Sequence, residues 1–336
     1  MFEFVQPLTD IDIETLSEIL DPVALAKHLQ GVWLGPWIGG RINEIQVSVL
    51  RHHVAQRCTL EIGVRTENGW HFLIGKVYRK DRSDFFQTMQ KVQKLGFGLH
   101  DEFSIPQSLA YLPSLRLLLQ EKVEGPTAEE VFISGDEAGR AAAAERCALW
   151  LARFHALAPH GGPVSRPSEY LNSKRMRRCG GEIVKLDGSF AGKADRLHHL
   201  LEDVAPSLSP AEVCAGHGAY RADHIILAAG RTVVFDLDTH DVADPARDLA
   251  RFLVALRRLA LELGSIRALD TAAEVFRRTY LAVGRPCAER NLPFFEAAAY
   301  LKRAKRILSH QVPQWRDKTE AMLDEGLRVL EQEVAR

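Results

Sequence analysis

The sequence has little of what marks a disulfide-stabilised, zinc-binding or membrane protein. Its 336 residues include five cysteines, which are far apart in the chain and never spaced as CxxC. This pattern favours reduced thiols over a disulfide framework or a zinc knuckle. No apolar stretch approaches the roughly 18 residues of a membrane span. The first residues also lack a basic segment followed by an apolar one, so we expect a cytoplasmic protein without a targeting signal.

Neither sign of charge is in excess, because 43 Lys and Arg balance 44 Asp and Glu to a net charge of −1. A general binder of nucleic acid or of membrane surfaces presents a basic field, so we expect neither kind of partner. A small-molecule ligand or a partner protein is expected instead. One local basic run is either a solvated helix face or loop, or an anion-docking patch: Lys174, Arg175, Arg177 and Arg178.

The first part of the chain is predicted to be rich in strands. After short helical material over residues 10–30, with Asp10 and Asp21 as caps, β-branched and aromatic residues predict three antiparallel strands: 42–54, 57–65 and 70–79. Asn68-Gly69 is a strong hairpin signal between the last two. A helix capped by Ser83 follows, its apolar face formed by Phe86, Met89 and Val92. Extended segments near 107–112 and 115–122 complete this part.

The rest of the chain is predicted to be mainly helical. Helices are expected over 127–134, 137–157, 193–204 and nearly all of the chain from 245 onward, with breaks near Gly264, Gly284 and Pro313. One β hairpin interrupts them at 213–245. At about 100–200 residues per domain, we predict an N-terminal lobe over 1–121 and a helical C-terminal lobe over 122–336.

The hairpin region holds the densest set of polar residues in the chain: His217, Asp223, His224, Asp236, Asp238 and His240. They are ordinary loop residues and caps, or ligands of a metal-dependent hydrolase site, or acids that hold Mg²⁺ for phosphoryl transfer. The HExxH motif is absent, so the hydrolase interpretation has little support.

Two segments of this region, HGAYRADHIIL and VVFDLDTHDVADPARDLA, resemble the aminoglycoside phosphotransferase and choline kinase-like family. That family's pattern is HGDxxxxN, two short strands, an IDxD/E segment and GDPxxDLA. LIGKVYRK, LLLQEKVEG and ALWLARFHAL resemble its lysine strand, its hinge and its LAxLH helix. The resemblance implies a two-lobed, protein-kinase-like α+β fold with a small β-rich N-lobe, a larger helical C-lobe and a nucleotide between them.

The resemblance also implies roles for individual residues. Lys76 would contact the phosphates of ATP, and Asp236, with Asp238 nearby, would hold Mg²⁺. His217 would have a structural role at the start of the catalytic loop, and Asp248 would tie that loop down. The backbone groups that would meet the adenine are those of Gln120, Glu121 and Val123.

The sequence departs from the family at the positions that carry chemistry. Ala219 stands where the family has its catalytic Asp, and His224 where it has the Asn that binds a second metal. The loop HHVAQRC between the first two strands has no glycine, which disfavours close approach of its backbone to phosphates. Asp223 or Asp238 could supply the missing carboxylate if the loop were rearranged.

These departures lead to a hypothesis of a pseudokinase, a kinase-fold relative with a degenerate active site. It would bind a nucleotide or metabolite with weak or no phosphoryl transfer. The alternatives are an active ATP- and Mg²⁺-dependent kinase of small hydroxylated molecules that uses a non-standard acid, and a scaffold module that no longer binds nucleotide.

Overall fold

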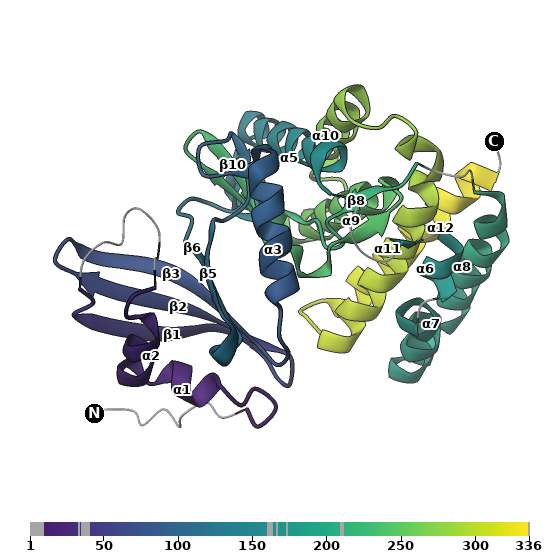
Figure 1. Ribbon diagram of the computed structural model, residues 1–336. Helices are drawn as coiled ribbons and strands as arrows, with labels where there is room; N and C mark the ends of the chain where they lie inside the picture. Colours follow the sequence, from purple (N-terminus) through teal and green to yellow (C-terminus); the bar gives the residue numbers. More distant parts are fainter. Residues whose placement is uncertain are drawn as a thin grey trace. The chain divides into compact units, whose positions relative to one another are not determined.

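The computed structural model describes residues 10–32, 34, 41–159, 164–165, 167–172, 174–208 and 212–334. The chain folds into two compact units, residues 1–124 and 125–336, and Figure 1 labels most of their helices and strands. Within the described residues, no helix is both long enough and apolar enough to cross a membrane.

The first unit is built on an antiparallel sheet. Its strands are β1 (Glu44–His53), β2 (Arg57–Thr66), β3 (Gly69–Tyr78), β5 (Ser108–Leu112) and β6 (Leu117–Glu121), in the order β1-β2-β3-β6-β5. The turn from β2 to β3 falls at the predicted Asn68-Gly69, where Gly69 has a φ of 107° that suits glycine. A further strand, β4 (Phe103–Ser104), has two residues. These strands agree with the expected ones to within a few residues.

Two short helices cover one face of this sheet, α1 (Leu16–Leu20) and α2 (Pro22–Leu29). Asp21 caps α2 as predicted, since its side chain accepts the N–H groups of Val23 and Ala24. The apolar residues of the helices and of the sheet form one core: Leu16, Ile19, Leu25, Leu29, Leu60, Ile62, Leu73, Val77, Leu117 and Leu119.

The helix after β3 differs in detail from its prediction. Helix α3 (Ser83–Val92) has Arg82, not Ser83, at its N-cap, and the Ser83 hydroxyl instead donates to Asp81. Its buried face contains Phe85, Met89 and Val92, so Phe85 is the buried aromatic residue and not Phe86 as predicted. The helix continues into a π-helical turn, η1 (Gln93–Phe97).

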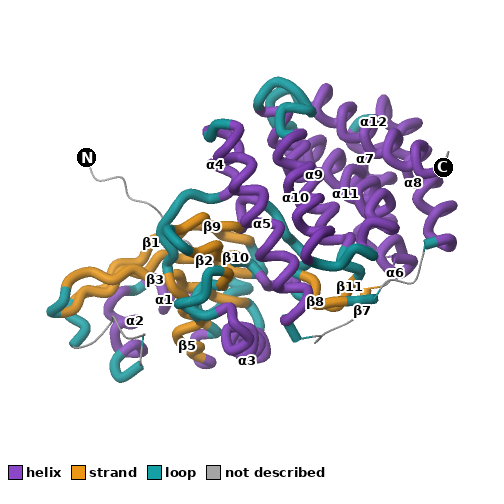
Figure 2. Tube along the Cα trace, turned by 90° about the horizontal axis from the view of Figure 1, so that it is seen from above, coloured by secondary structure: helices purple, strands orange, loops and turns teal. Residues whose placement is uncertain are grey.

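The second unit is mainly helical. Its helices are α4 (Ala128–Ser134), α5 (Glu137–Leu157), α6 (Pro167–Asn172), α7 (Lys174–Leu186), α8 (Ala191–Val204), α9 (Ala246–Glu262), α10 (Asp270–Val283), α11 (Ala288–His310) and α12 (Trp315–Val334). Helices α9 and α11 lie side by side in this unit (Figure 2). The breaks of the C-terminal region fall where the sequence predicted them.

Helix α7 was not predicted, because basic residues and Gly180-Gly181 mask its apolar stripe of Met176, Cys179 and Ile183. The structure describes the backbone of the predicted basic run as part of α7, but the side chains of the run lie outside what it describes: Lys174, Arg175, Arg177 and Arg178.

Short strands lie among these helices. Strands β9 (Ile225–Ala228) and β10 (Arg231–Val234) form the predicted antiparallel hairpin. Strand β11 (Asp241–Ala243) pairs antiparallel with β8 (Cys214–Gly216) and parallel with β7 (Val164–Ser165). These strands place the residues 217–223 and 235–240 in loops at the ends of short, buried ladders.

Candidate functional site

The loop that follows β8 is held in place by one buried carboxylate. Asp248, near the start of α9, accepts the backbone N–H of His217 at 2.6 Å and that of Gly218 at 3.1 Å. Gly218 has a φ of 79°, and a Cβ added there would lie 2.1 Å from the carbonyl oxygen of Thr239. The loop therefore requires glycine at position 218 and a hydrogen-bond acceptor at position 248.

The Asp248 carboxylate is ionised although it is buried. Burial alone would raise its pKa, but the hydrogen bond to His155 and the charges of Arg247 and Arg251 hold the pKa well below its usual range. His155 Nε2 lies 3.5 Å from Asp248 Oδ2, and its Nδ1 lies 2.6 Å from the hydroxyl of Tyr280. Asp248 is thus a fixed negative charge beneath the loop.

His217 has backbone partners on both ring nitrogens. Nε2 lies 3.1 Å from the carbonyl oxygen of Phe235, and Nδ1 accepts the N–H of Ala219 at 3.2 Å. The two contacts define the tautomer with hydrogen on Nε2. Burial lowers the pKa of His217 to about 4, so the ring is neutral at physiological pH.

Asp223 is the next acidic residue along the loop after Ala219. Asp223 lies in a 3₁₀ turn (Ala222–His224), with Oδ2 2.8 Å from Nη2 of Arg221. It lines a cavity of 270 Å³ that does not include Ala219 among its lining residues. His224 Nε2 lies 2.7 Å from the same Nη2 and 3.7 Å from Asp236 Oδ2. Asp223 and His224 are therefore both engaged with Arg221.

The two predicted metal ligands follow β10. Asp236 has a left-handed backbone with a φ of 66°, and Asp238 lies in the 3₁₀ turn Leu237–Thr239. Across the part of the chain that the structure describes, no group of three or more His, Cys, Asp or Glu side chains could hold a metal ion. Mg²⁺ commonly takes one or two carboxylates together with water and substrate phosphates, so the partly exposed Asp236 fits that ion. The imidazole of His224 does not.

The predicted nucleotide contacts of the first unit lie on one face of its sheet. Lys76 on β3 stands opposite Leu118 on β6. Directly opposed residues share a face, as do residues two apart along a strand, so Gln120 lies on the face of Lys76. The neighbouring residues along the strands, Val77 on β3 and Leu119 on β6, point to the opposite face and belong to the core there. Lys76 and Gln120 thus occupy the sheet face that α1 and α2 do not cover.

The other two predicted adenine contacts lie at and beyond the end of β6. The N–H of Glu121 donates to the carbonyl of Gln107 at 2.9 Å, and the carboxylate of Glu121 accepts the N–H of Gln107 at 3.1 Å. Val123 follows the strand, next to Lys122, whose ammonium lies 2.7 Å from Glu61.

The glycine-free turn between β1 and β2 is occupied by a side chain from the N-terminal segment. Asp10 Oδ2 accepts the N–H of Ala55 at 2.9 Å and lies 2.7 Å from Nε2 of His52. Asp10 was predicted as a helix cap, and the structure corrects this, because α1 begins only at Leu16 with Thr15 at its N-cap. The other oxygen of Asp10, Oδ1, accepts the N–H of Asp12 at 3.0 Å within its own segment. Ala55 has a φ of 59°, a left-handed conformation that is unfavourable for alanine. The turn therefore presents a carboxylate where a phosphate-binding loop would present N–H groups.

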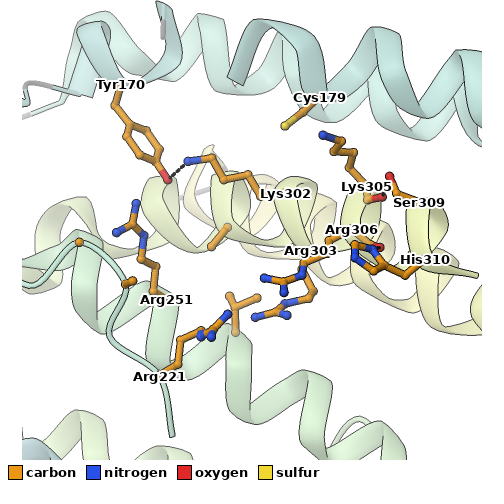
Figure 3. Close-up of a pocket in the computed structure, with 14 residues that line it drawn as sticks. Tyr170, Cys179, Arg221, Arg251, Lys302, Arg303, Lys305, Arg306, Ser309 and His310 are labelled. Carbon is orange, nitrogen blue, oxygen red and sulfur yellow. Dashed lines mark hydrogen bonds between the residues drawn. The ribbon is translucent and has the colours of Figure 1, made fainter. Parts of the chain in front are cut away.

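A cavity of 440 Å³ in the second unit includes Gly218 and Ala219 in its wall. Six of the residues that line it are Lys or Arg, and they lie on α9, α11 and the loop after β8, while Tyr170 and Cys179 come from α6 and α7 (Figure 3). Sequence reasoning missed Arg251 and the four cations of α11, Lys302, Arg303, Lys305 and Arg306. The local signal was the run KRAKR within this helix.

Comparison with known proteins identifies the class. Residues 64–289 match the phosphotransferase enzyme family, and the chain belongs to that family. The predicted family and the protein-kinase-like α+β fold are confirmed. No curated protein matches the sequence.

Solved structures show the same fold at low identity. A candidate aminoglycoside phosphotransferase of Ralstonia eutropha JMP134 has a TM-score of 0.63 and 14% identity, over 92% of this chain and 97% of that chain. The amicoumacin kinase hAmiN, in complex with AMP-PNP, Ca²⁺ and Ami, has a TM-score of 0.58 and 13% identity, over 95% and 96%. A choline/ethanolamine kinase family protein of Mesorhizobium loti has a TM-score of 0.56 and 13% identity, over 91% and 94%. The chain is a kinase-fold relative of small-molecule phosphotransferases.

Proposed function

We propose that this chain binds a small molecule and a nucleotide within the kinase-like fold, with weak or no phosphoryl transfer between them. The observation that carries the proposal is Ala219, which occupies the place of the family's catalytic Asp. A general base must come within about 2.6–3.2 Å of the proton that it removes. The methyl group of Ala219 can neither accept a proton nor orient a hydroxyl.

The alternative is an active kinase of small hydroxylated molecules that uses Asp223 as its acid. In the structure, the Asp223 carboxylate is engaged with Arg221 and faces the smaller cavity. To act beside Ala219 it would have to break that ion pair and reorient within a short 3₁₀ turn. Asp238 would have to leave the turn after Asp236 in the same way. The geometry therefore favours the degenerate site.

We propose that nucleotide binding, where it remains, depends on Lys76 for the phosphates and on Asp236 for Mg²⁺. Gln120, Glu121 and Val123 would meet the adenine. The bound Mg²⁺ would supply charge neutralisation for the phosphates. The hAmiN kinase, which has this fold, binds AMP-PNP, and this supports the assignment.

The turn at Ala55 argues that such binding is weak. Its N–H is already engaged by Asp10, and the Asp10 carboxylate would repel phosphate oxygens. The Asp10 pKa lies below its usual value, chiefly because of the hydrogen bond from Ala55, so this carboxylate is ionised.

Restoring the missing carboxylate tests the proposal. We expect Ala219→Asp to raise the rate of ATP consumption, measured across a panel of hydroxylated acceptors, by about 10²–10⁴-fold, the usual contribution of a general base. Ala219→Asn is the matched control, because it adds a similar side chain without a base. Rapid transfer by the unmodified protein, abolished by Asp223→Asn, would show instead that Asp223 is the working acid.

Melting midpoints with and without Mg·ATP test the nucleotide assignment. A ligand bound only by the native state stabilises it by RT ln(1 + [L]/Kd). We expect a small rise in the midpoint of the unmodified protein and none in Lys76→Ala or Asp236→Asn. Absence of any rise in the folded protein would favour a scaffold module that no longer binds nucleotide.

A further inference from the structure

The cavity beside Ala219 collects positive charge from three separate elements. Its cationic lining residues are Arg221 from the loop after β8, Arg251 from α9, and Lys302, Arg303, Lys305 and Arg306 from α11. Among the described residues that line it, none is Asp or Glu. At 440 Å³, the cavity has the size of a site for a small organic ligand.

The spacing of the cations on α11 explains why they converge. Lys302 and Arg306 are four residues apart and Arg303 and Arg306 three apart, so their side chains leave the helix on neighbouring rows of one side. Figure 3 shows the guanidinium groups of Arg221, Arg303 and Arg306 gathered together, while Arg251 and Lys302 extend toward Tyr170. The loop after β8, helix α9 and helix α11 are separate in the chain, yet each places positively charged side chains in the wall of this cavity.

Some of these charges have anionic partners outside the cavity wall. Arg221 pairs with Asp223, Lys305 pairs with Glu182, and Arg251 Nη1 lies 3.8 Å from Asp248 Oδ1. Asp248, however, is already shared with two backbone N–H groups and His155.

Other donors have no acceptor within the described structure. Arg303 has neither an ion pair nor a side-chain hydrogen bond to any described residue. Two buried guanidinium nitrogens, Nε of Arg221 and Nη1 of Arg251, also have no hydrogen-bond acceptor there. Lys302 donates to the hydroxyl of Tyr170 at 2.7 Å, which is a neutral partner when the phenol is protonated. Buried donors without acceptors cost about 1–3 kcal/mol each, and more when they are charged.

The local field is positive enough to change the ionisation of its neighbours. Burial and the charges of Arg258, Arg221 and Arg306 lower the pKa of Arg303 to about 9. Burial would raise the pKa of Tyr170, but Lys302, Arg251 and Arg247 bring it down to about 8. Both shifts indicate that the apo cavity destabilises its own cations and favours a negative charge inside it.

A structural explanation of the cluster accounts for only part of it. Cations near a helix C-terminus complement the helix dipole, and this applies to His310 in the last turn of α11. The dipole effect falls off within the last turn, so it does not reach Lys302 and Arg303. Nor is this a solvated helix face, because Lys302 and Arg303 are half-buried and two of the arginines come from other elements.

We propose that this cavity binds a compact polyanion, a small organic molecule that carries two or more phosphate or carboxylate groups. The proposal rests on the function proposed above, in which the family's fold holds a small molecule next to the catalytic loop, and it names the chemical class of that molecule. Arg303 and Arg221 supply planar guanidinium forks that match phosphate and carboxylate oxygens, and Lys302 adds a point charge. Ala219 lies in the wall of the same cavity, so the ligand lies against the catalytic loop.

Titration calorimetry with inorganic pyrophosphate, in a chloride buffer without nucleotide or Mg²⁺, tests this site. We expect saturable binding by the unmodified protein and a loss of affinity of about 10-fold or more in Arg303→Met, because one charged hydrogen-bonding group is removed. Arg303→Lys, which keeps the charge, should retain most of the affinity. The matched control is Arg290→Met, which makes the same change at an exposed position of α11 outside this cavity.

Further titrations distinguish a ligand that carries phosphate groups from one that carries carboxylate groups. Fructose 1,6-bisphosphate represents phosphates, citrate represents carboxylates, and gentamicin, a polycation, should not bind this cavity. Pyrophosphate binding that is unchanged by Arg303→Met, or that the folded unmodified protein lacks, overturns the proposal.

Failure of this inference is distinguishable from failure of the proposed function. The titrations contain no nucleotide, so we expect Lys76→Ala to bind pyrophosphate like the unmodified protein. Equal losses of affinity in Lys76→Ala and Arg303→Met would assign the anion to the nucleotide phosphates and overturn the inference. Phosphoryl transfer by the unmodified protein bears on the proposed function alone.

Discussion

Two groups of charged residues adjoin the loop that follows β8, and they differ in how their buried charges are paired. In the first group, which holds the loop, opposite charges meet: Arg247 Nη1 lies 2.6 Å from Asp241 Oδ2, and Asp248 binds two backbone N–H groups. In the second group, which lines the 440 Å³ cavity, like charges meet, and Arg303 forms no ion pair with a described residue, although the more distant charge of Asp223 attracts it. Arg251 lies at the junction of the two groups.

The difference separates what stabilises this fold from what the fold can bind. A buried charge with complementary partners holds a loop in one conformation. A set of half-buried like charges opposes folding, and natural proteins retain such conflicts mainly at functional sites. Residues of the first group should therefore affect stability when they are changed, whereas residues of the second group should affect binding and, if anything, improve stability.

The largest effect is expected at Asp248. Asp248→Asn removes the negative charge that compensates Arg251. It also places an amide NH₂ group, which is a donor, opposite the N–H of His217 or Gly218, so that one of these hydrogen bonds is lost. Breaking a buried charged network in this way costs about 3–5 kcal/mol. We expect that loss in the free energy of unfolding, measured by urea denaturation. Asp195→Asn, at an exposed position of α8, is the control and should change stability little.

A smaller effect of opposite sign is expected at Arg303. Arg303→Met keeps a long, flexible side chain and removes the repulsion from Arg221, Arg258 and Arg306. We expect the free energy of unfolding of the ligand-free protein to rise by about 1 kcal/mol, as for other relieved conflicts at functional sites. A loss of more than that amount would mean that Arg303 serves the fold, and the contrast between the two groups would then be wrong.

The sequence predicted the fold well because the signals for it are local. The Asn68-Gly69 turn, the cap at Asp21 and the Gly and Pro residues between C-terminal helices each act on adjacent backbone. Predictions failed where the tertiary structure recruits a residue. Asp10 accepts the N–H of the distant Ala55 as well as that of Asp12 and caps no helix, and the Ser83 hydroxyl donates to Asp81.

The candidate site was predictable only in part, for a related reason. Motif spacing assigned roles to His217, Ala219 and Asp236 from one loop region, and these roles stay predictions. The cavity depends on side chains from α9 and α11 that no local pattern joins to that loop. A net charge of −1 for the whole chain also conceals a basic site, since charges of the other sign lie elsewhere.

The smallest effect should be visible at Tyr170, which reports the field in the cavity. With its pKa lowered to about 8, against 10 for an ordinary phenol, Tyr170 is partly ionised near pH 8 in the folded protein. A bound polyanion offsets the positive field of Lys302, Arg251 and Arg247, so the pKa of Tyr170 should rise and the phenolate should take up a proton.

We therefore expect the tyrosinate absorbance of the folded protein near pH 8 to fall when pyrophosphate is added, and to show no such change in Tyr170→Phe. The sign of the stability effect follows from the same shift. Between about pH 8 and 10, the unfolded chain holds a proton on Tyr170 that the folded chain has released. Ionisation of Tyr170 thus makes stability rise with pH in that window, relative to Tyr170→Phe. A phenol that titrates near 10 with or without the anion would mean that the cations of this cavity are already neutralised, and that the two groups of charges do not differ.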